Sequence, residues 1–213
     1  GNTVFSNTGF PGPSVSISAP SPTITNSGPV VFTVTYTNAA AITLAAGDVT
    51  LNQIGNATGT IGVSGSGLTS RTVTISSITG DGTLGISIAA GTAADNGGSG
   101  ARSAGPSNTF ETDNTGPAIV IGSPSASSTT TGPVTYTITY TDADSISLVA
   151  GDVTLNKTDT ADGTVAVTGS GATERTVTIS PITGDGTPGL PSAPGTALDA
   201  LGTVSSSLFY VPT

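Results

Sequence analysis

The feature that most constrains the fold of this chain is an internal repeat. Residues 13–95 align with residues 117–199 without a gap, so each residue of the first copy has a counterpart 104 positions later. GPVVFTVTYT corresponds to GPVTYTITYT, and RTVTISSITGDGT corresponds to RTVTISPITGDGT. A period of about 100 residues is longer than a solenoid unit of about 20–50 residues and matches a whole domain. The repeat predicts two copies of one domain, residues 13–114 and 115–213. Residues 1–12 are then an extended N-terminal arm or the end of a preceding repeat.

Within each copy, apolar and polar residues alternate with a period of two. This alternation is typical of a β-strand with one buried face. The inward positions are Val30, Phe32, Val34 and Tyr36 in the first copy, and Val134, Tyr136, Ile138 and Tyr140 in the second. Such segments are short, show no helical period and are separated by turn sequences such as SGSG and TGDG. The sequence therefore predicts an all-β chain of two tandem immunoglobulin-like antiparallel β-sandwich domains.

Two places break the correspondence between the copies. Where the first copy reads TLGISIAAG, the second reads TPGLPSAPG, which places Pro188, Pro191 and Pro194 in an expected central strand. Because proline has no N–H to donate to a neighbouring strand, we expect this strand to be broken or bulged. The first copy also has extra residues before its closing phenylalanine. They belong to NGGSGARSAGPS, residues 96–107, which we interpret as a flexible loop.

Composition excludes several classes of function. The chain carries 4 Lys and Arg against 13 Asp and Glu, and its net charge of −9 is unsuited to binding nucleic acid or an anionic membrane surface. No apolar run approaches the roughly 18 residues of a membrane span. Because the chain has no Cys and no His, it cannot form a disulfide, a thiolate zinc site or a Ser-His or Cys-His nucleophile pair. We expect no enzyme, no nucleic-acid partner and no membrane span in this segment.

Several motifs resemble those of a known family. GDVTLN, GSG followed by RTVTIS, ITGDGTLGISIAAGTA and the closing TDNTGP are similar to bacterial Ig-like domain repeats of large surface and biofilm-associated adhesins. The resemblance covers nearly the whole chain in both copies. It implies an extracellular protein, on the bacterial cell surface or secreted, that acts in cell adhesion as a non-catalytic stalk or adhesin segment. Its implied partners are neighbouring repeats or identical subunits, and a host or biofilm matrix ligand.

Acidic residues are distributed unevenly between the copies. Where the first copy has Asn38 and Ala40, the second has Asp142 and Asp144. In the expected fold, several carboxylates gather where the two domains meet: Asp142, Asp144, Asp199, Asp113 of the linker and, from the first domain, Asp81 and Asp48. Calcium takes six to eight oxygen ligands and suits such a set, and the resemblance implies calcium as well. We predict a structural calcium ion held by Asp113, Asp142, Asp144, Asp199 and Asp81. The alternative is that Asp142 and Asp144 form a solvated turn, because Asp favours turns.

A second class of function stays open. The N-terminal stretch GNTVFSNTGFPGP resembles the domain-closing SNTFETDNTGP, so residues 3–6 are interpreted as a last strand without a domain of its own. If the native chain continues upstream, this strand ends another repeat. If Gly1 is a mature terminus, the strand is free to pair with another copy. The alternative function is a self-assembling structural subunit of an extracellular filament, sheath or surface layer, with strand pairing by the N-terminal arm.

Overall fold

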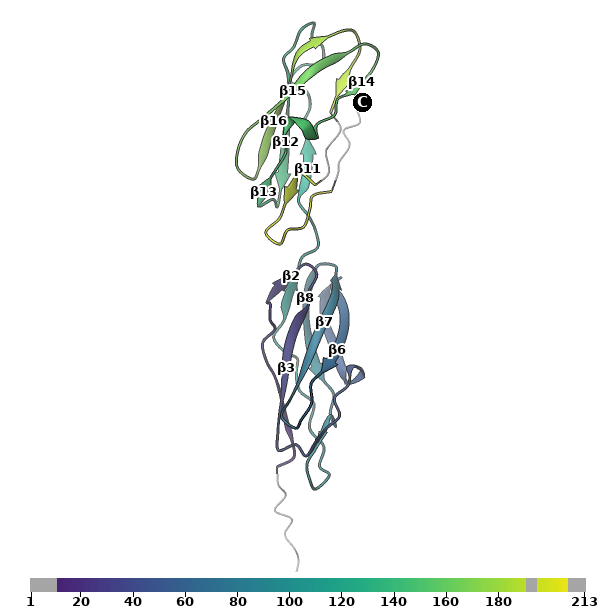
Figure 1. Cartoon of the computed structure of the whole chain (residues 1–213), viewed down its shortest axis with the longest axis vertical. Coiled ribbons are helices and arrows are strands. Elements are labelled where there is room, and N and C mark those ends of the chain that lie inside the picture. Colours follow the sequence, from purple (N-terminus) through teal and green to yellow (C-terminus); the bar gives the residue numbers. More distant parts are fainter. Residues whose placement is uncertain (1–10, 191–194, 207–213) are drawn as a thin grey trace, which may run out of the picture. The chain divides into compact units, whose positions relative to one another are not determined.

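A computed structural model describes residues 11–190 and 195–206 of the chain. This part divides into two compact units, of which unit 1 ends at Asn114 and unit 2 begins at Thr115 (Figure 1). The N-terminal arm lies outside the described residues as far as residue 10. Within the described residues, the only helices are two 3-10 turns, η1 (Ala46–Asp48) and η2 (Ala150–Asp152). The prediction of an all-β chain is confirmed. No helix in this part of the chain is long and apolar enough to cross a membrane.

Unit 1 is a β-sandwich of two four-stranded sheets. The first sheet has the order β1 (Ser14–Ile17), β3 (Val30–Thr37), β7 (Ser70–Thr79), β6 (Thr58–Ser64). The second has the order β2 (Ile24–Thr25), β10 (Phe110–Thr112), β8 (Gly82–Ile88), β5 (Val49–Gly55). A short pair consists of β4 (Ala41–Ile42) and β9 (Ala93–Ala94). Neighbouring strands are antiparallel, as predicted, except that β2 runs parallel to β10.

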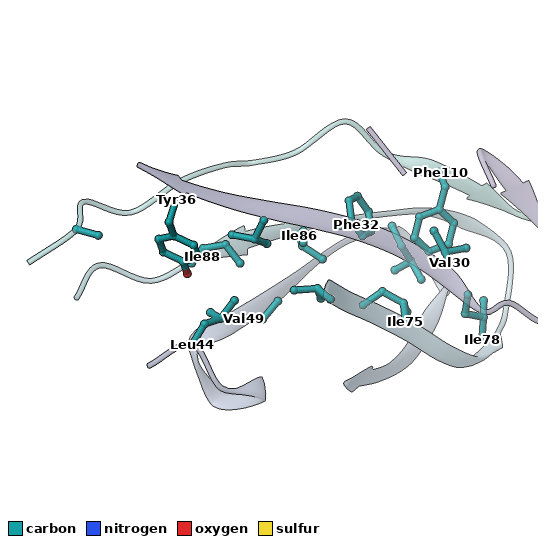
Figure 2. Close-up of a cluster of buried hydrophobic side chains, with 14 of the residues drawn as sticks. Val30, Phe32, Tyr36, Leu44, Val49, Ile75, Ile78, Ile86, Ile88 and Phe110 are labelled. Carbon is teal, nitrogen blue, oxygen red and sulfur yellow. The ribbon is translucent and has the colours of Figure 1, made fainter. Parts of the chain in front are cut away.

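The core of unit 1 follows from the alternation in the sequence. Along β3, Val30, Phe32, Val34 and Tyr36 are buried, as predicted, while the residues between them face outward or are half-buried. Figure 2 shows Val30, Phe32 and Tyr36 in this cluster of buried side chains, and the rings of Phe32 and Phe110 lie with their centroids 6.2 Å apart. Full burial of each such side chain contributes about 1.5–3 kcal/mol. The period of two therefore places one continuous apolar layer between the sheets.

In the described residues, unit 2 repeats most strands of unit 1 at the same offset of 104 residues. Its four-stranded sheet has the order β11 (Ala118–Ile121), β12 (Val134–Thr141), β16 (Glu174–Thr183), β15 (Asp162–Thr168). Its short pairs are β13 (Ser145–Ile146) with β18 (Ala197–Leu198), and β14 (Asn156–Lys157) with β17 (Pro188–Gly189). Strand register is also repeated, since Val15 lies opposite Tyr36 in unit 1 and Ile119 opposite Tyr140 in unit 2. The inward residues predicted for β12 are buried.

The second sheet of unit 2 is reduced where the prolines occur. In unit 1, β5 and β8 are paired along seven residues, from Val49 opposite Ile88 to Gly55 opposite Gly82. In unit 2, the corresponding strands β14 and β17 are paired along two, and Pro188 is one of the paired residues. The predicted interruption is confirmed in the described residues. Pro191 and Pro194 lie outside them.

The glycine-rich segment of residues 96–107, predicted to be a flexible loop, is joined to the sandwich by backbone hydrogen bonds over residues 101–107. Ala101 is buried and donates its N–H to the carbonyl oxygen of Ala93 at 2.8 Å. Ala104 and Ile88 exchange two backbone hydrogen bonds of 3.0 and 2.8 Å. Small side chains allow this segment to lie against the end of β8 and extend the second sheet there.

Candidate functional site

Asp81 and Asp113 lie at one end of unit 1, where β10 leaves the sandwich. Asp81 occupies the turn between β7 and β8, and its Oδ1 accepts a hydrogen bond of 2.6 Å from the backbone N–H of Asn114. Asp113 directly follows β10 and donates its N–H to the carbonyl oxygen of Thr25 at 3.2 Å. The Asp81 carboxylate therefore already holds the chain at the last residue of unit 1, a role that the sequence did not reveal.

Asp142 and Asp144 follow β12 in unit 2, and both side chains are exposed. Asp142 has a φ of 61°, in the left-handed region, and its counterpart Asn38 has a φ of 57°. Asp and Asn adopt this conformation more readily than other residues with a side chain, because their short polar side chains hydrogen-bond locally. Backbone conformation therefore accounts for the choice of Asp or Asn at this position. It gives no reason for Asp144, whose counterpart is Ala40.

Asp144 and Asp199 are neighbours at the ends of β13 and β18. The N–H of Asp144 donates to the carbonyl oxygen of Leu198 at 2.8 Å. Oδ1 of Asp199 accepts the N–H groups of Leu201 and Thr203, both at 2.8 Å, which closes a tight loop. Its Oδ2 is buried and has no hydrogen-bond partner among the described residues. One oxygen of Asp199 thus has a structural role, and the other is unused in this part of the chain.

The structure places four of the predicted calcium ligands beside the ends of paired strands within each unit: Asp81 and Asp113 beside β8 and β10, and Asp144 and Asp199 beside β13 and β18. No group of three or more acidic, His or Cys side chains that could hold a metal ion occurs in residues 11–190 and 195–206. Asp48 was expected to lie with Asp81 among the carboxylates near the second domain, and this expectation is wrong. It immediately precedes β5 and caps η1, with Oδ2 accepting the Ala45 N–H at 2.9 Å, so it lies at the opposite end of β5 from Asp81.

Two tyrosine–threonine pairs join distant segments in the two cores. The hydroxyl of Tyr36 donates to Oγ1 of Thr92 at 3.0 Å, and the hydroxyls of Tyr140 and Thr196 are 3.3 Å apart. Desolvation by burial raises the pKa of both tyrosines above the ordinary value, although the hydrogen bond between each tyrosine and its threonine opposes this. Each pair recurs at the offset of 104, which is the signal that could have identified it in the sequence.

Arg71 and Arg175 hold equivalent turns in the two units. The Arg175 guanidinium is buried and donates to the carbonyl oxygens of Gly171, Glu174 and Ile146 at 2.9, 2.8 and 3.1 Å. Arg71 makes the same three contacts in unit 1. The guanidinium thereby ties the turn before β7 or β16 to the short strand β4 or β13. We assign both arginines a structural role.

An open groove of about 300 Å³ lies between β1 and the segment of residues 104–108. Its lining is Val15, Ser16, Ile17, Ala104, Gly105, Pro106, Ser107 and Asn108. None of these residues is a carboxylate, an amine or another group that could act as an acid, base or strong nucleophile at neutral pH.

Comparison of the chain with models of protein families, with curated proteins and with solved structures finds no match.

Proposed function

We propose that the chain is a non-catalytic extracellular stalk or adhesin segment of a bacterial surface protein, built from two immunoglobulin-like repeats. The observation that carries this proposal is the repetition of the first four-stranded sheet and its register at one offset, in two units that each have their own core. The motifs shared with bacterial adhesin repeats support the same interpretation.

The strand order of unit 1 supports the immunoglobulin-like assignment. In immunoglobulin nomenclature, the order β1-β3-β7-β6 corresponds to strands A, B, E and D, and β10-β8-β5 to strands G, F and C. The first strand of such a fold is often split between the sheets, which is how we interpret β1 and β2. In unit 2 the described residues include the A, B, E and D strands and shortened C and F strands.

The arrangement of β2 and β10 suits a protein under tension. They run parallel, with Ile24 opposite Glu111 and Thr25 opposite Thr112, and Glu111 donates to the carbonyl oxygen of Thr23 at 2.9 Å. When the two ends of unit 1 are pulled apart, β2 is drawn backward and β10 forward along the same axis. The hydrogen bonds between them are then loaded together in shear instead of one after another.

The proposal is tested by stretching the chain between handles at its two ends. We expect two discrete unfolding events, one per unit, because each unit has a separate core, and we expect both to recover on relaxation. A chain that extends smoothly at low force would contradict the role as a stalk.

A self-assembling structural subunit is the second candidate, and one observation favours it. The edge strand β5, with the sequence VTLNQIG, is seven residues long and uncharged, and its Ile54 is 72% exposed. Its counterpart β14 has two residues and includes Lys157. A long edge strand without charge is a template for strand pairing with another chain. In this proposal the N-terminal arm of a second copy supplies the added strand.

Deleting residues 1–10 separates this candidate from the first. If the arm pairs with β5, the deletion abolishes oligomers or filaments, and so does Ile54→Lys, while both units stay folded by circular dichroism. Assembly that survives both changes would discard the arm, and a full-length chain that stays monomeric would favour the stalk.

We further propose that calcium binds the acidic residues Asp113, Asp142, Asp144, Asp199 and Asp81. Two observations support this proposal: Asp144 and Asp199 adjoin the paired strands β13 and β18 at the same end, and Oδ2 of Asp199 is buried without a hydrogen-bond partner among the described residues. Affinity should be about 10⁻⁴–10⁻³ M, as in extracellular modules. Asp142→Asn combined with Asp144→Ala should remove a calcium-dependent rise in melting temperature. If calorimetry detects no binding at millimolar calcium, Asp142 and Asp144 form a solvated turn.

A further inference from the structure

The loop of residues 95–99 contains the one Asn–Gly pair of the sequence, Asn96 followed by Gly97. Asn96 and Gly97 are both exposed. Glycine leaves the backbone nitrogen after an asparagine unhindered, so this dipeptide is the one most prone to spontaneous cyclisation. Asparagine is among the residues lost from proteins that must resist heat for this reason.

The Asp95 carboxylate closes this loop. Its Oδ1 accepts the backbone N–H of Gly97 and that of Ser99, both at 2.8 Å. Two backbone bonds of 3.1 Å complete the turn: Asp95 donates to the Ser99 carbonyl oxygen, and Gly98 donates to that of Asp95. The N–H that would have to react is therefore already bound to an ionised acceptor.

Cyclisation requires this same nitrogen. The Gly97 nitrogen attacks Cγ of Asn96, so that an N–Cγ bond forms and the Cγ–Nδ2 bond breaks. The amide proton of Gly97 leaves with the side-chain nitrogen as ammonia. Water then opens the cyclic imide at either carbonyl and yields aspartate or isoaspartate. The product carries one more negative charge, and isoaspartate lengthens the backbone of the turn.

We propose that Asn96 is a latent site of self-modification by deamidation, which the Asp95 carboxylate keeps unreactive. The peptide bond between Asn96 and Gly97 is trans, so the N–H points in the direction that Cγ of Asn96 must take to close the five-membered ring. While that N–H donates to Asp95, the acceptor oxygen occupies the path of attack. The negative charge of Asp95 also disfavours loss of the amide proton, because it repels the anion that forms.

Unit 2 provides an internal control for this arrangement. Asp199 holds the N–H groups of Leu201 and Thr203 in the same way, but Ala200 stands where unit 1 has Asn96. The carboxylate that closes the loop is therefore common to both units, whereas the reactive side chain occurs in unit 1 alone. The hydrogen bonds from the loop to the carboxylate therefore form whether or not an asparagine follows it.

The test is peptide mapping of aspartate and isoaspartate at position 96 after incubation of the intact chain at mildly alkaline pH. We expect the folded protein to react about tenfold or more slowly than the same chain in denaturant, since a hydrogen bond to a charged group is worth about one decade in population. Asp95→Ala should accelerate the reaction in the folded protein by a similar factor. Asn96→Ala removes the signal and confirms its assignment.

Two outcomes would overturn the proposal. One is a folded chain in which Asn96 reacts as fast as in denaturant; the other is an Asp95→Ala variant that stays folded by circular dichroism yet reacts no faster. If Asp95→Ala unfolds unit 1, the proposal is tested instead by introducing an Asn–Gly pair at the equivalent position of unit 2. The double variant Ala200→Asn with Leu201→Gly places an Asn–Gly pair directly after Asp199 in unit 2. There we expect the same slow deamidation. Fast deamidation in this folded variant would refute the proposal that the carboxylate suppresses the reaction.

Discussion

Position 142 has a left-handed backbone with a φ of 61°, and so does its counterpart Asn38, with a φ of 57°. A carboxylate at this position therefore needs no metal to account for it, because an Asp or Asn satisfies the backbone. Asp95 and Asp199 likewise accept backbone N–H groups within their own loops, and Asp81 accepts that of Asn114 after β10. At the scale of residues, the acidic side chains serve first to shape turns.

Substitution at position 142 tests this account of the turn. Asp142→Asn should leave the free energy of unfolding unchanged within about 0.5 kcal/mol, because Asn holds the same conformation in unit 1. Asp142→Val should destabilise unit 2 by about 1–2 kcal/mol, since a β-branched side chain is strained at positive φ. Urea unfolding followed by circular dichroism measures both. Equal destabilisation by the two substitutions would show that the charge, not the backbone, matters here.

The buried tyrosines predict a response to alkaline pH. Burial raises the pKa of Tyr36 and Tyr140 in the folded chain, so the folded state retains protons that the unfolded state releases. Their contribution to the free energy of unfolding is complete below the unfolded pKa of about 10 and is lost as the pH rises from there through the folded pKa. The free energy of unfolding should thus fall above about pH 10, and the variant with Tyr36→Phe and Tyr140→Phe should show a shallower fall. If the free energy of unfolding falls equally steeply with pH in this variant, these tyrosines do not cause the loss of stability at alkaline pH.

At the scale of elements, two neighbouring strands approach so closely at some positions that only glycine fits, and the alternation of apolar and polar residues does not reveal these positions. Gly82 begins β8 with a φ of 139°, and a Cβ there would lie 2.0 Å from the carbonyl oxygen of Ile54 on β5. Gly186 has the same environment against Thr158 in unit 2. Each glycine lets the second sheet form directly after its turn.

Gly82→Ala should therefore destabilise unit 1 by about 1–3 kcal/mol or more, because the strained φ adds to a clash with backbone. Gly47→Ala is the matched control: no atom lies within 4 Å of its added Cβ, and its φ is not positive. Thermal unfolding should separate the two variants clearly. A Gly82→Ala protein as stable as the control would mean that β5 can shift without loss.

Sequence reasoning located the strands because alternation reports burial directly, as at Phe32 and Tyr36. It also located the interruption at Pro188, since a missing N–H is a local property. The parallel pairing of β2 with β10 could not be predicted from the sequence. The partner of so short a strand depends on the tertiary structure, and two residues such as Ile24 and Thr25 do not specify it. The glycine-rich segment around Ala101 misled it, because small residues suit close packing as well as flexibility.

At the scale of the whole molecule, the chain consists of two units with separate cores and one shared plan. The core of unit 1 includes Phe32 and Phe110, and that of unit 2 includes Tyr136 and Ile179. Each unit therefore has the apolar cluster that a domain needs to fold independently. A mechanical role requires in addition that force along the chain meets the strands in shear.

The central claim is tested most directly by the direction in which unit 1 is pulled. The chain has no cysteine, so introduced pairs give unique handles. Gly12→Cys with Thr115→Cys loads β2 and β10 along their axes, whereas Gln53→Cys with Thr115→Cys pulls across the second sheet and peels β10 from β8 starting at Thr112. We expect a clearly higher unfolding force for the first pair than for the second. Equal forces in the two directions, or a lower force along the chain, would contradict a stalk that carries tension.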